Sequence, residues 1–236
     1  MRTAMALKDD LVKEVRDTFT TAWEEQTTTG VPDPTDLKLG NHAKNLETAT
    51  VLYADLDGST NMVDTKTWSF SAEVYKTYLR CAARLIAAEE GVVTAYDGDR
   101  VMAIFTGDMK NTRAVRAAMK INHAVKTIVN PELKAFYKST DFIVKHVIGI
   151  DTTQLRAARI GVRGYNDLVW IGRAANYAAK LTSLSEKPLW ITKAVYDVMA
   201  DDVKIHNETK LDMWVPRSWT PMNGMLVYCS TYGYVI

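Results

Sequence analysis

The chain has 236 residues, of which 47% are hydrophobic and 24% charged, and a formal net charge of +1. These values are typical of a soluble protein with one sizeable core, and the dispersed lysines and arginines exclude the basic surface needed to bind duplex nucleic acid. Residues 1–10 lack the apolar core of a signal peptide, and no run approaches the ~20 apolar residues that span a bilayer. We therefore expect a cytoplasmic protein without direct membrane insertion. Cys81 and Cys229 lie far apart without metal-ligand spacing, which predicts free thiols.

The N-terminal segment reads as a helix followed by a connector. Between Leu7 and Gln26, apolar residues recur at four-residue steps among charged ones, which favours an amphipathic helix that needs a partner surface. Residues 27–45 hold glycines and prolines that break helices. We therefore divide the chain into an N-terminal helical extension and connector, residues 1–45, and a main domain, residues 46–236.

The stretch from Val51 to Thr60 predicts a buried strand that ends at a charged turn. Because side chains on a strand alternate between its faces, Tyr53 and Asp55 point one way, and Leu52 and Ala54 the other. A carboxylate at a strand end more often caps the next helix than binds a ligand, so Asp55 alone decides little.

The rest of the chain alternates between helical and strand patterns. In order, we expect helix in 61–90 with a stop at Gly91, a hairpin over Gly91–Phe105, helix from Thr112 to Val129 ended by Asn130-Pro131, strands Phe142–Asp151 and Leu168–Ile171, helix Gly172–Leu181, strand Leu189–Thr192, helix Lys193–Met199 and strand Met225–Cys229. The pattern predicts an α+β domain whose βααββαβ order suggests a ferredoxin-like core.

The expected hairpin places acidic residues around Gly98 at its tip. If it pairs beside the first strand, Asp55 and Asp99 converge, and two converging carboxylates repel unless cations lie between them. The pattern therefore favours a site for Mg²⁺ or Mn²⁺. On the later Ala-rich helix, Asn176 and Lys180 are four residues apart on one face, from which both reach one ligand.

These features together resemble the catalytic domain of class III nucleotidyl cyclases, a ferredoxin-like palm that works as a head-to-tail homodimer with composite active sites. The resemblance covers about Leu46 to the C-terminus. It rests on three motifs in the family's order: Ala54–Thr60, then Gly98-Asp99 with Met102–Phe105, then Ile171-Gly172 with Asn176 and Lys180. Each motif alone is weak, but three in order are a strong signal.

The positions that read a purine base in this family are apolar here. Ala95, four residues before Asp99, stands where purine cyclases carry Lys or Glu, and Val169, seven before Asn176, replaces an Asp. Tyr53 adds bulk near the base. The combination resembles the bacterial pyrimidine cyclases of the Pycsar anti-phage system. The resemblance implies conversion of UTP to 3′,5′-cyclic UMP, a second messenger for a separate cyclic-nucleotide-responsive effector.

By this resemblance, the ribose 3′-oxygen attacks the α-phosphate of the same nucleotide and pyrophosphate leaves. Asp55, Asp99 and the Leu56 carbonyl would hold two Mg²⁺ or Mn²⁺ ions about 3.5 to 4 Å apart. Donors to phosphate would come from the turn after the strand, namely Gly58, Ser59 and Thr60. Asp57 is interpreted as a turn residue.

The resemblance also assigns residues to the other subunit's site. Asn176 would orient the ribose, and Lys180 would offset charge on the α-phosphate, where the family usually has Arg. A lysine lacks the guanidinium fork, so Arg173 on the same helix is a candidate to share this role. Arg217 is the candidate for the triphosphate.

Three alternatives stay open. A cytidylate cyclase making cyclic CMP is the nearest, because no residue that reads uracil against cytosine is identified. The next alternative is an adenylate or guanylate cyclase. The last is a non-catalytic nucleotide-binding domain, and the presence of both metal aspartates argues against it. A GGDEF diguanylate cyclase shares the palm, but Tyr96–Arg100 is a poor version of its motif.

Overall fold

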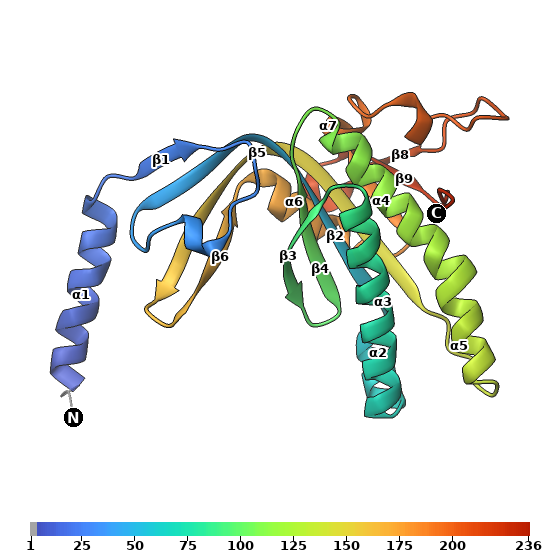
Figure 1. The fold of residues 1–236 in the computed structure, drawn as a ribbon, viewed down its shortest axis with the longest axis horizontal. Coiled ribbons are helices and arrows are strands. Elements are labelled where there is room, and N and C mark those ends of the chain that lie inside the picture. The colour runs from blue at the N-terminus through green and yellow to red at the C-terminus, as the bar shows by residue number, and fades with distance from the viewer. Residues whose placement is uncertain (1–3) are drawn as a thin grey trace.

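A nine-stranded mixed sheet organises the computed structural model, which describes residues 4–236 (Figure 1). Residues 1–3, the start of the stretch considered for a signal peptide, lie outside the described residues. The strands are β1 (Glu24–Thr27), β2 (His42–Asp57), β3 (Val92–Asp97), β4 (Arg100–Phe105), β5 (Lys145–Val162), β6 (Tyr165–Ile171), β7 (Leu189–Thr192), β8 (Val215–Trp219) and β9 (Met225–Ser230). The main path runs β3-β4-β2-β5-β7-β9-β8, while β1 pairs with β2 and β6 with β5.

The helices are α1 (Ala4–Thr20), α2 (Ser59–Thr65), α3 (Trp68–Ala88), α4 (Lys110–Ala124), α5 (Asn130–Phe136), α6 (Arg173–Leu181) and α7 (Lys193–Tyr196). Short 3₁₀ turns occur at Pro34–Asp36, Asp201–Val203 and Thr220–Met222, and a π-helical turn joins α4 to α5. From β2 to β5 the chain follows the order β2-α2-α3-β3-β4-α4-β5, so the expected ferredoxin-like βααββαβ core is confirmed.

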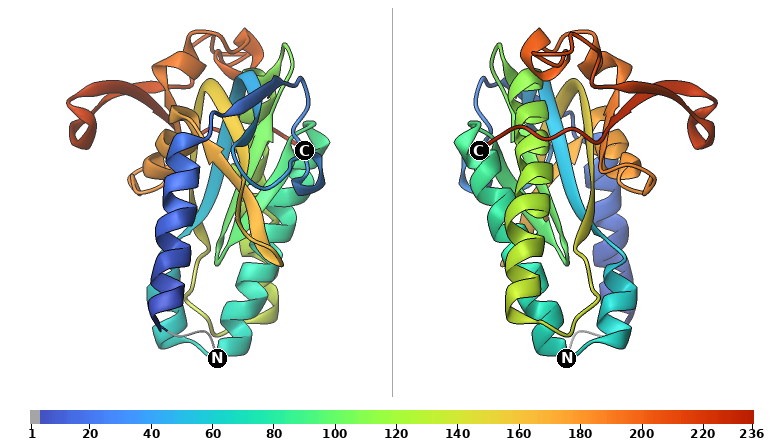
Figure 2. Two further views of the ribbon diagram at one scale, coloured as in Figure 1. Left: turned by 90° about the vertical axis from the view of Figure 1, so that its left-hand side faces the viewer. Right: turned by 90° about the vertical axis from the view of Figure 1, so that its right-hand side faces the viewer.

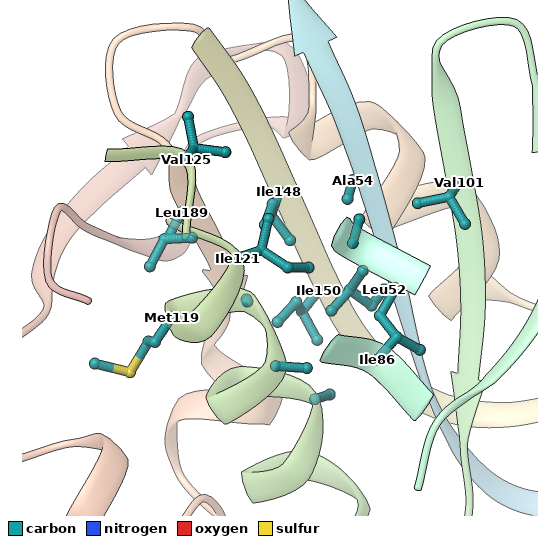
Figure 3. Close-up of a cluster of buried hydrophobic side chains, with 14 of the residues drawn as sticks. Leu52, Ala54, Ile86, Val101, Met119, Ile121, Val125, Ile148, Ile150 and Leu189 are labelled. Carbon is teal, nitrogen blue, oxygen red and sulfur yellow. The ribbon is translucent and has the colours of Figure 1, made fainter. Parts of the chain in front are cut away.

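The alternation of side chains along β2 separates two layers of the molecule. Leu52 and Ala54 are fully buried in a core between the sheet and the helices α3 and α4, which pack side by side (Figures 2 and 3). Val51, on the other face, belongs to a second cluster against which Tyr53 packs. Burial of each aliphatic side chain contributes about 1.5–3 kcal/mol to the free energy of folding. Because a shift by one residue would exchange the two faces of β2, this burial also fixes the register of β2 in the sheet.

The second layer is covered by α6, which lies directly on β5. Ala174, Ala175 and Ala178 are buried against the sheet, and their small side chains let the helix approach closely. The approach is closest at Gly149 of β5, where an added Cβ would lie only 2.1 Å from the carbonyl oxygen of Ala178. Gly149 pairs with Tyr53 in the sheet, so it sets the height of α6 above the middle of β2.

The N-terminal segment differs from the expected helix. α1 ends at Thr20 rather than continuing to Gln26, because Glu24–Thr27 pair in parallel with the first residues of β2, and this backbone pairing overrides the four-residue apolar spacing. Asn41 holds the end of α1 by donating from Nδ2 to two backbone carbonyls. The apolar residues Leu11 and Phe19 stay exposed, on a helix that stands apart from the sheet (Figure 1). β2 starts at His42 and so runs across the division expected after residue 45.

Two further segments extend beyond their expected limits. The helix expected to stop at Asn130-Pro131 continues through a π-helical turn, Val125–Val129, into α5, which has Pro131 in its first turn. β5 runs from Lys145 to Val162 rather than over Phe142–Asp151, because β6 begins at Tyr165 and pairs with its second half. Leu168–Ile171 therefore pair with Arg156–Arg159, which lie beyond the expected end of the first strand at Asp151.

Two expectations drawn from composition can be compared with the structure. Cys81 and Cys229 are free thiols, as expected. Within residues 4–236, no helix combines the length and apolar character that a bilayer crossing requires.

The contact at Gly149 predicts a specific sensitivity. We expect Gly149→Ala to lower the free energy of unfolding by about 1–3 kcal/mol, because the new methyl group forces α6 off the sheet. Urea denaturation followed by circular dichroism measures this change. Gly30→Ala is the control, since a Cβ at Gly30 meets nothing within 4 Å. Equal effects of the two substitutions would contradict the packing argument.

Candidate functional site

Two acidic side chains converge where β2 ends beside the β3–β4 hairpin. Asp55 lies opposite Arg100 in the antiparallel β2–β4 ladder, and Asp99 precedes Arg100 in the hairpin turn. The turn needs a left-handed residue, and Gly98, with a φ of 61°, provides it without strain. The hairpin pairs beside β2 as expected, and the charge of Asp99 acts on the carboxyl of Asp55.

The pKa of Asp55 reflects this environment. Burial raises the pKa of the Asp55 carboxyl from 3.8 to about 6, and the charge of Asp99 adds to the rise, while Arg100 and the Thr182 hydroxyl act in the opposite direction. Buried Tyr78 of α3 donates from its hydroxyl to the backbone carbonyl of Asp55 at 3.4 Å. Burial and the same two carboxylates raise the pKa of Tyr78 as well. A half-buried acidic pair of this kind is stabilised by a cation.

The oxygen donors at this strand end suit a hard divalent cation. The Leu56 side chain is apolar and buried in the core, so a role of this residue in metal binding is limited to its backbone carbonyl. No group of three or more His, Cys, Asp or Glu side chains suited to a metal ion is formed within residues 4–236. Mg²⁺ is commonly bound by one or two carboxylates together with substrate phosphates and water, so Asp55 and Asp99 fit such an ion.

The turn after β2 leads directly into α2. Gly58 has a φ of 78°, which turns the chain into the helix, and Ser59 and Thr60 are the first helical residues. The expected phosphate donors therefore lie together immediately after the Asp55 strand. Asp57 is the last residue of β2 and pairs with Lys145 in the ladder.

Arg173, at the start of α6, forms an ion pair with a fully buried carboxylate. Its Nε lies 3.2 Å from Oδ2 of Asp151 on β5, and Oγ1 of Thr192 donates to Oδ1 of Asp151 at 2.5 Å. A charge buried this completely needs such partners, and removing one is strongly destabilising. Arg173 therefore ties the beginning of α6 to the sheet.

Asn176 and Lys180 lie on the exposed face of α6, opposite the buried alanines. Neither side chain forms a hydrogen bond or ion pair within the part of the chain that the structure describes. The structure thus brings the two groups to one surface, as the sequence predicted, and leaves them available to a ligand outside this chain.

The remaining sequence candidates occupy other places. Tyr53 packs beside the second core cluster, two residues before Asp55, and burial raises the pKa of its phenol. Ala95 on β3 and Val169 on β6 are exposed, at strands on opposite sides of β2. Arg217 is exposed on β8, where its Nη1 donates to the Pro216 carbonyl at 3.0 Å. Nothing within residues 4–236 connects Arg217 to the acidic pair.

Sequence reasoning missed three neighbours of the acidic pair. Tyr78 and Thr182 reach Asp55 from α3 and from the end of α6, which no local pattern indicates. Arg100 directly follows Asp99 in the sequence, but a charged residue beside an acidic turn is typical of a solvent-exposed surface. In the structure its guanidinium carbon lies 5.3 Å from the centre of the Tyr53 ring.

Comparison with known proteins places the chain among close relatives. It is 59% identical to a uridylate cyclase of Burkholderia cepacia over 233 residues, which is 98% of this chain and 100% of the relative. It is 54% identical to a uridylate cyclase of Xanthomonas perforans over 230 residues, covering 97% and 98% of the two chains. No protein-family model matches the sequence.

Solved structures with low sequence identity show the same fold. The crystal structure of the guanylyl cyclase Cya2 has a TM-score of 0.67 at 17% identity, covering 80% of this chain and 94% of that one. A dimeric guanylyl cyclase domain from Blastocladiella emersonii has a TM-score of 0.62 at 14% identity, covering 79% and 97%. These similarities support the ferredoxin-like core and its arrangement of strands.

The raised pKa of Asp55 predicts a pH-dependent stability. Because the folded chain holds this proton more tightly than an unfolded chain does, ionisation of Asp55 between pH 3.8 and about 6 destabilises the metal-free protein. We expect Asp55→Asn to be more stable than the wild type at about pH 7 to 8, with the difference shrinking as the pH falls toward about 4. Urea denaturation in EDTA at several pH values measures it.

Added Mn²⁺ provides the control for this prediction. It should stabilise the wild type at about pH 7 to 8 and have little effect on Asp55→Asn, which lacks one of the carboxylates. A stability difference that is the same at every pH would show that Asp55 ionisation does not oppose folding.

Proposed function

The chain belongs to the uridylate cyclase family, and on this basis we propose that it converts UTP into 3′,5′-cyclic UMP and pyrophosphate. It is therefore a nucleotidyl cyclase, built on the fold of the class III enzymes. The observation that carries the proposal is the convergence of Asp55 and Asp99 at the end of the β2–β4 ladder, in a chain so similar to named uridylate cyclases.

We assign the acidic pair to the binding of two Mg²⁺ or Mn²⁺ ions, with the Leu56 carbonyl as a further ligand. When bound, such ions supply activation of the attacking 3′-oxygen and neutralisation of the leaving pyrophosphate. The chain itself provides alignment: the Asp55 strand is fixed on both sides by β4 and β5, and Tyr78 holds its backbone. Positioning of a reactive group beside its target removes much of the entropic barrier of a cyclisation.

The turn after β2 is proposed to bind the phosphates. Gly58, Ser59 and Thr60 present backbone N–H groups and hydroxyls directly beside the carboxylates. Arg217 stays the candidate for the far end of the triphosphate, because its guanidinium is exposed and has no carboxylate partner within residues 4–236.

We propose a head-to-tail homodimer in which α6 completes the partner's site. Asn176 and Lys180 support this proposal because both are exposed and unpartnered in one chain. Asn176 would orient the ribose, and Lys180 would offset charge on the α-phosphate. Arg173 is held by Asp151, so its contribution is to keep α6 in place while Lys180 reaches the nucleotide.

The proposed preference for a pyrimidine follows from the side chains around the base. Ala95 and Val169 offer no hydrogen bond to a purine edge, and a buried polar edge without a partner is disfavoured. Tyr53 narrows the space beside Asp55, so that a six-membered ring fits where a fused bicycle collides. A cytoplasmic role in anti-phage defence, with a separate effector for the cyclic nucleotide, stays a prediction from the Pycsar resemblance.

Product analysis tests the proposed function. Purified protein with Mn²⁺ and each of the four nucleoside triphosphates should release cyclic UMP and pyrophosphate from UTP, detected by mass spectrometry. Asp55→Ala and Asp99→Ala should lower this activity by about 1,000-fold or more, because each removes a metal ligand. Asp57→Ala is the matched control, since this neighbouring carboxylate has no assigned ligand role, and it should stay active.

Each product reports on a different part of the proposal. Cyclic AMP or cyclic GMP as the main product would contradict the account of the base pocket, and cyclic CMP would contradict only the choice of uracil. Activity that persists in a folded Asp55→Ala protein would contradict the metal assignment.

Composite sites predict that two inactive variants complement each other. In a head-to-tail heterodimer of Asp55→Ala and Asn176→Ala chains, one site receives both substitutions and the other receives none. We expect the mixture to recover about a quarter of wild-type activity after subunit exchange, since half of the dimers are mixed and each has one intact site. Exchange confirmed by native mass spectrometry without recovered activity would place each complete site within a single chain.

A further inference from the structure

Arg100 occupies a special position between the acidic pair and Tyr53. It is the first residue of β4, pairs with Asp55 across the ladder and directly follows Asp99. Its guanidinium carbon lies 5.3 Å from the centre of the Tyr53 ring, and its Nη2 donates to Oδ2 of Asp97 at 2.9 Å. The ring contact and the ion pair together hold the guanidinium in one orientation over Tyr53.

The guanidinium keeps unused donors. Within residues 4–236 its only hydrogen bond is the one to Asp97, and Nε is buried without any acceptor. An arginine stays charged at every ordinary pH and cannot become an acceptor. Nε is covered by protein atoms, so the donors left for a ligand are the guanidinium N–H groups that Asp97 does not engage, on a side chain that is 31% exposed.

The register partners of Tyr53 do not provide such a donor. Met102 on β4 and Gly149 on β5 are the register partners of Tyr53 on its two sides, and neither has a polar side chain. Ala95, which pairs with Met102 in the next ladder, has none either. Among the register partners of Tyr53 and Asp55, Arg100 is therefore the one with a free donor for a base packed on Tyr53.

Uracil and cytosine differ at the base edge that such a donor reads. Uracil carries the carbonyl acceptor O4, whereas cytosine carries an amino group at the same carbon. A site built around a fixed donor accepts O4 and leaves an amino group facing another donor without a partner. Rejection of an analogue that leaves a buried polar group unpaired is a strong form of discrimination.

We propose that Arg100 is the residue that selects uracil over cytosine, by donating from its guanidinium to O4 of a base packed on Tyr53. This inference rests on the proposed function and names the group that reads the base. Asp97 acts as a positioning residue, because its carboxylate orients the guanidinium.

The test compares the kcat/KM for UTP with that for CTP. We expect the wild type to favour UTP and Arg100→Met to lower the UTP/CTP ratio about tenfold or more, because the donor to O4 is lost. Arg100→Lys keeps a charged donor and should preserve most of the preference. Arg113→Met is the matched control. The Arg113 side chain on α4 is 31% exposed, as that of Arg100 is, and it pairs with Glu90. The UTP/CTP ratio of this variant should therefore equal that of the wild type.

The outcomes separate this inference from the proposed function. A wild type that makes no cyclic UMP overturns the proposed function itself. With an active wild type, an unchanged ratio in Arg100→Met overturns the role of Arg100. If kcat/KM falls equally with both substrates, the UTP/CTP ratio is likewise unchanged, and Arg100 acts only on the neighbouring carboxylates. If Arg100→Met is inactive, equilibrium binding of non-cyclisable UTP and CTP analogues to the folded variant gives the same ratio.

Discussion

The proximity of Asp55 and Asp99 is the constraint on which the rest of the structure depends. Two carboxylates so close together are unfavourable, and burial raises the pKa of Asp55 further, so the chain must hold them in place by other means. The β2–β4 ladder does this through backbone hydrogen bonds, and a large core of aliphatic side chains under Leu52 and Ala54 stabilises the ladder. The hydrophobic core therefore offsets an unfavourable arrangement that Arg100 and Thr182 relieve only in part.

The face of the sheet that carries Asp55 is covered in part by α6. Gly149 lets α6 lie directly on β5, and Asp151 anchors the start of the helix through Arg173. With one side of α6 fixed in this way, Asn176 and Lys180 are presented outward from a rigid support. In the proposed dimer, a side chain that acts in the partner's site benefits from such a support, because a loosely held group loses geometry and therefore rate.

The surroundings of Tyr53 combine side chains from three neighbouring strands. The ring comes from β2, the guanidinium above it from β4, and the carboxylate that orients the guanidinium from β3. The same arginine moderates the charge at Asp55, opposite it in the ladder. If Arg100 reads the base as proposed, one residue of β4 serves both base recognition and the acidic pair.

The sequence by itself determined the βααββαβ order, the two faces of β2 and the hairpin that carries Asp99, because alternation, helical spacing and turn glycines are local signals. Other features were decided only by tertiary structure. Residues 24–27 form a strand because the edge of β2 accepts their backbone, and β5 extends because β6 pairs with it. Likewise, Arg173 is tied to Asp151, and Arg100 is placed over Tyr53, by contacts between residues far apart in the chain. No local pattern records such contacts, since they depend on how complete strands and helices pack together.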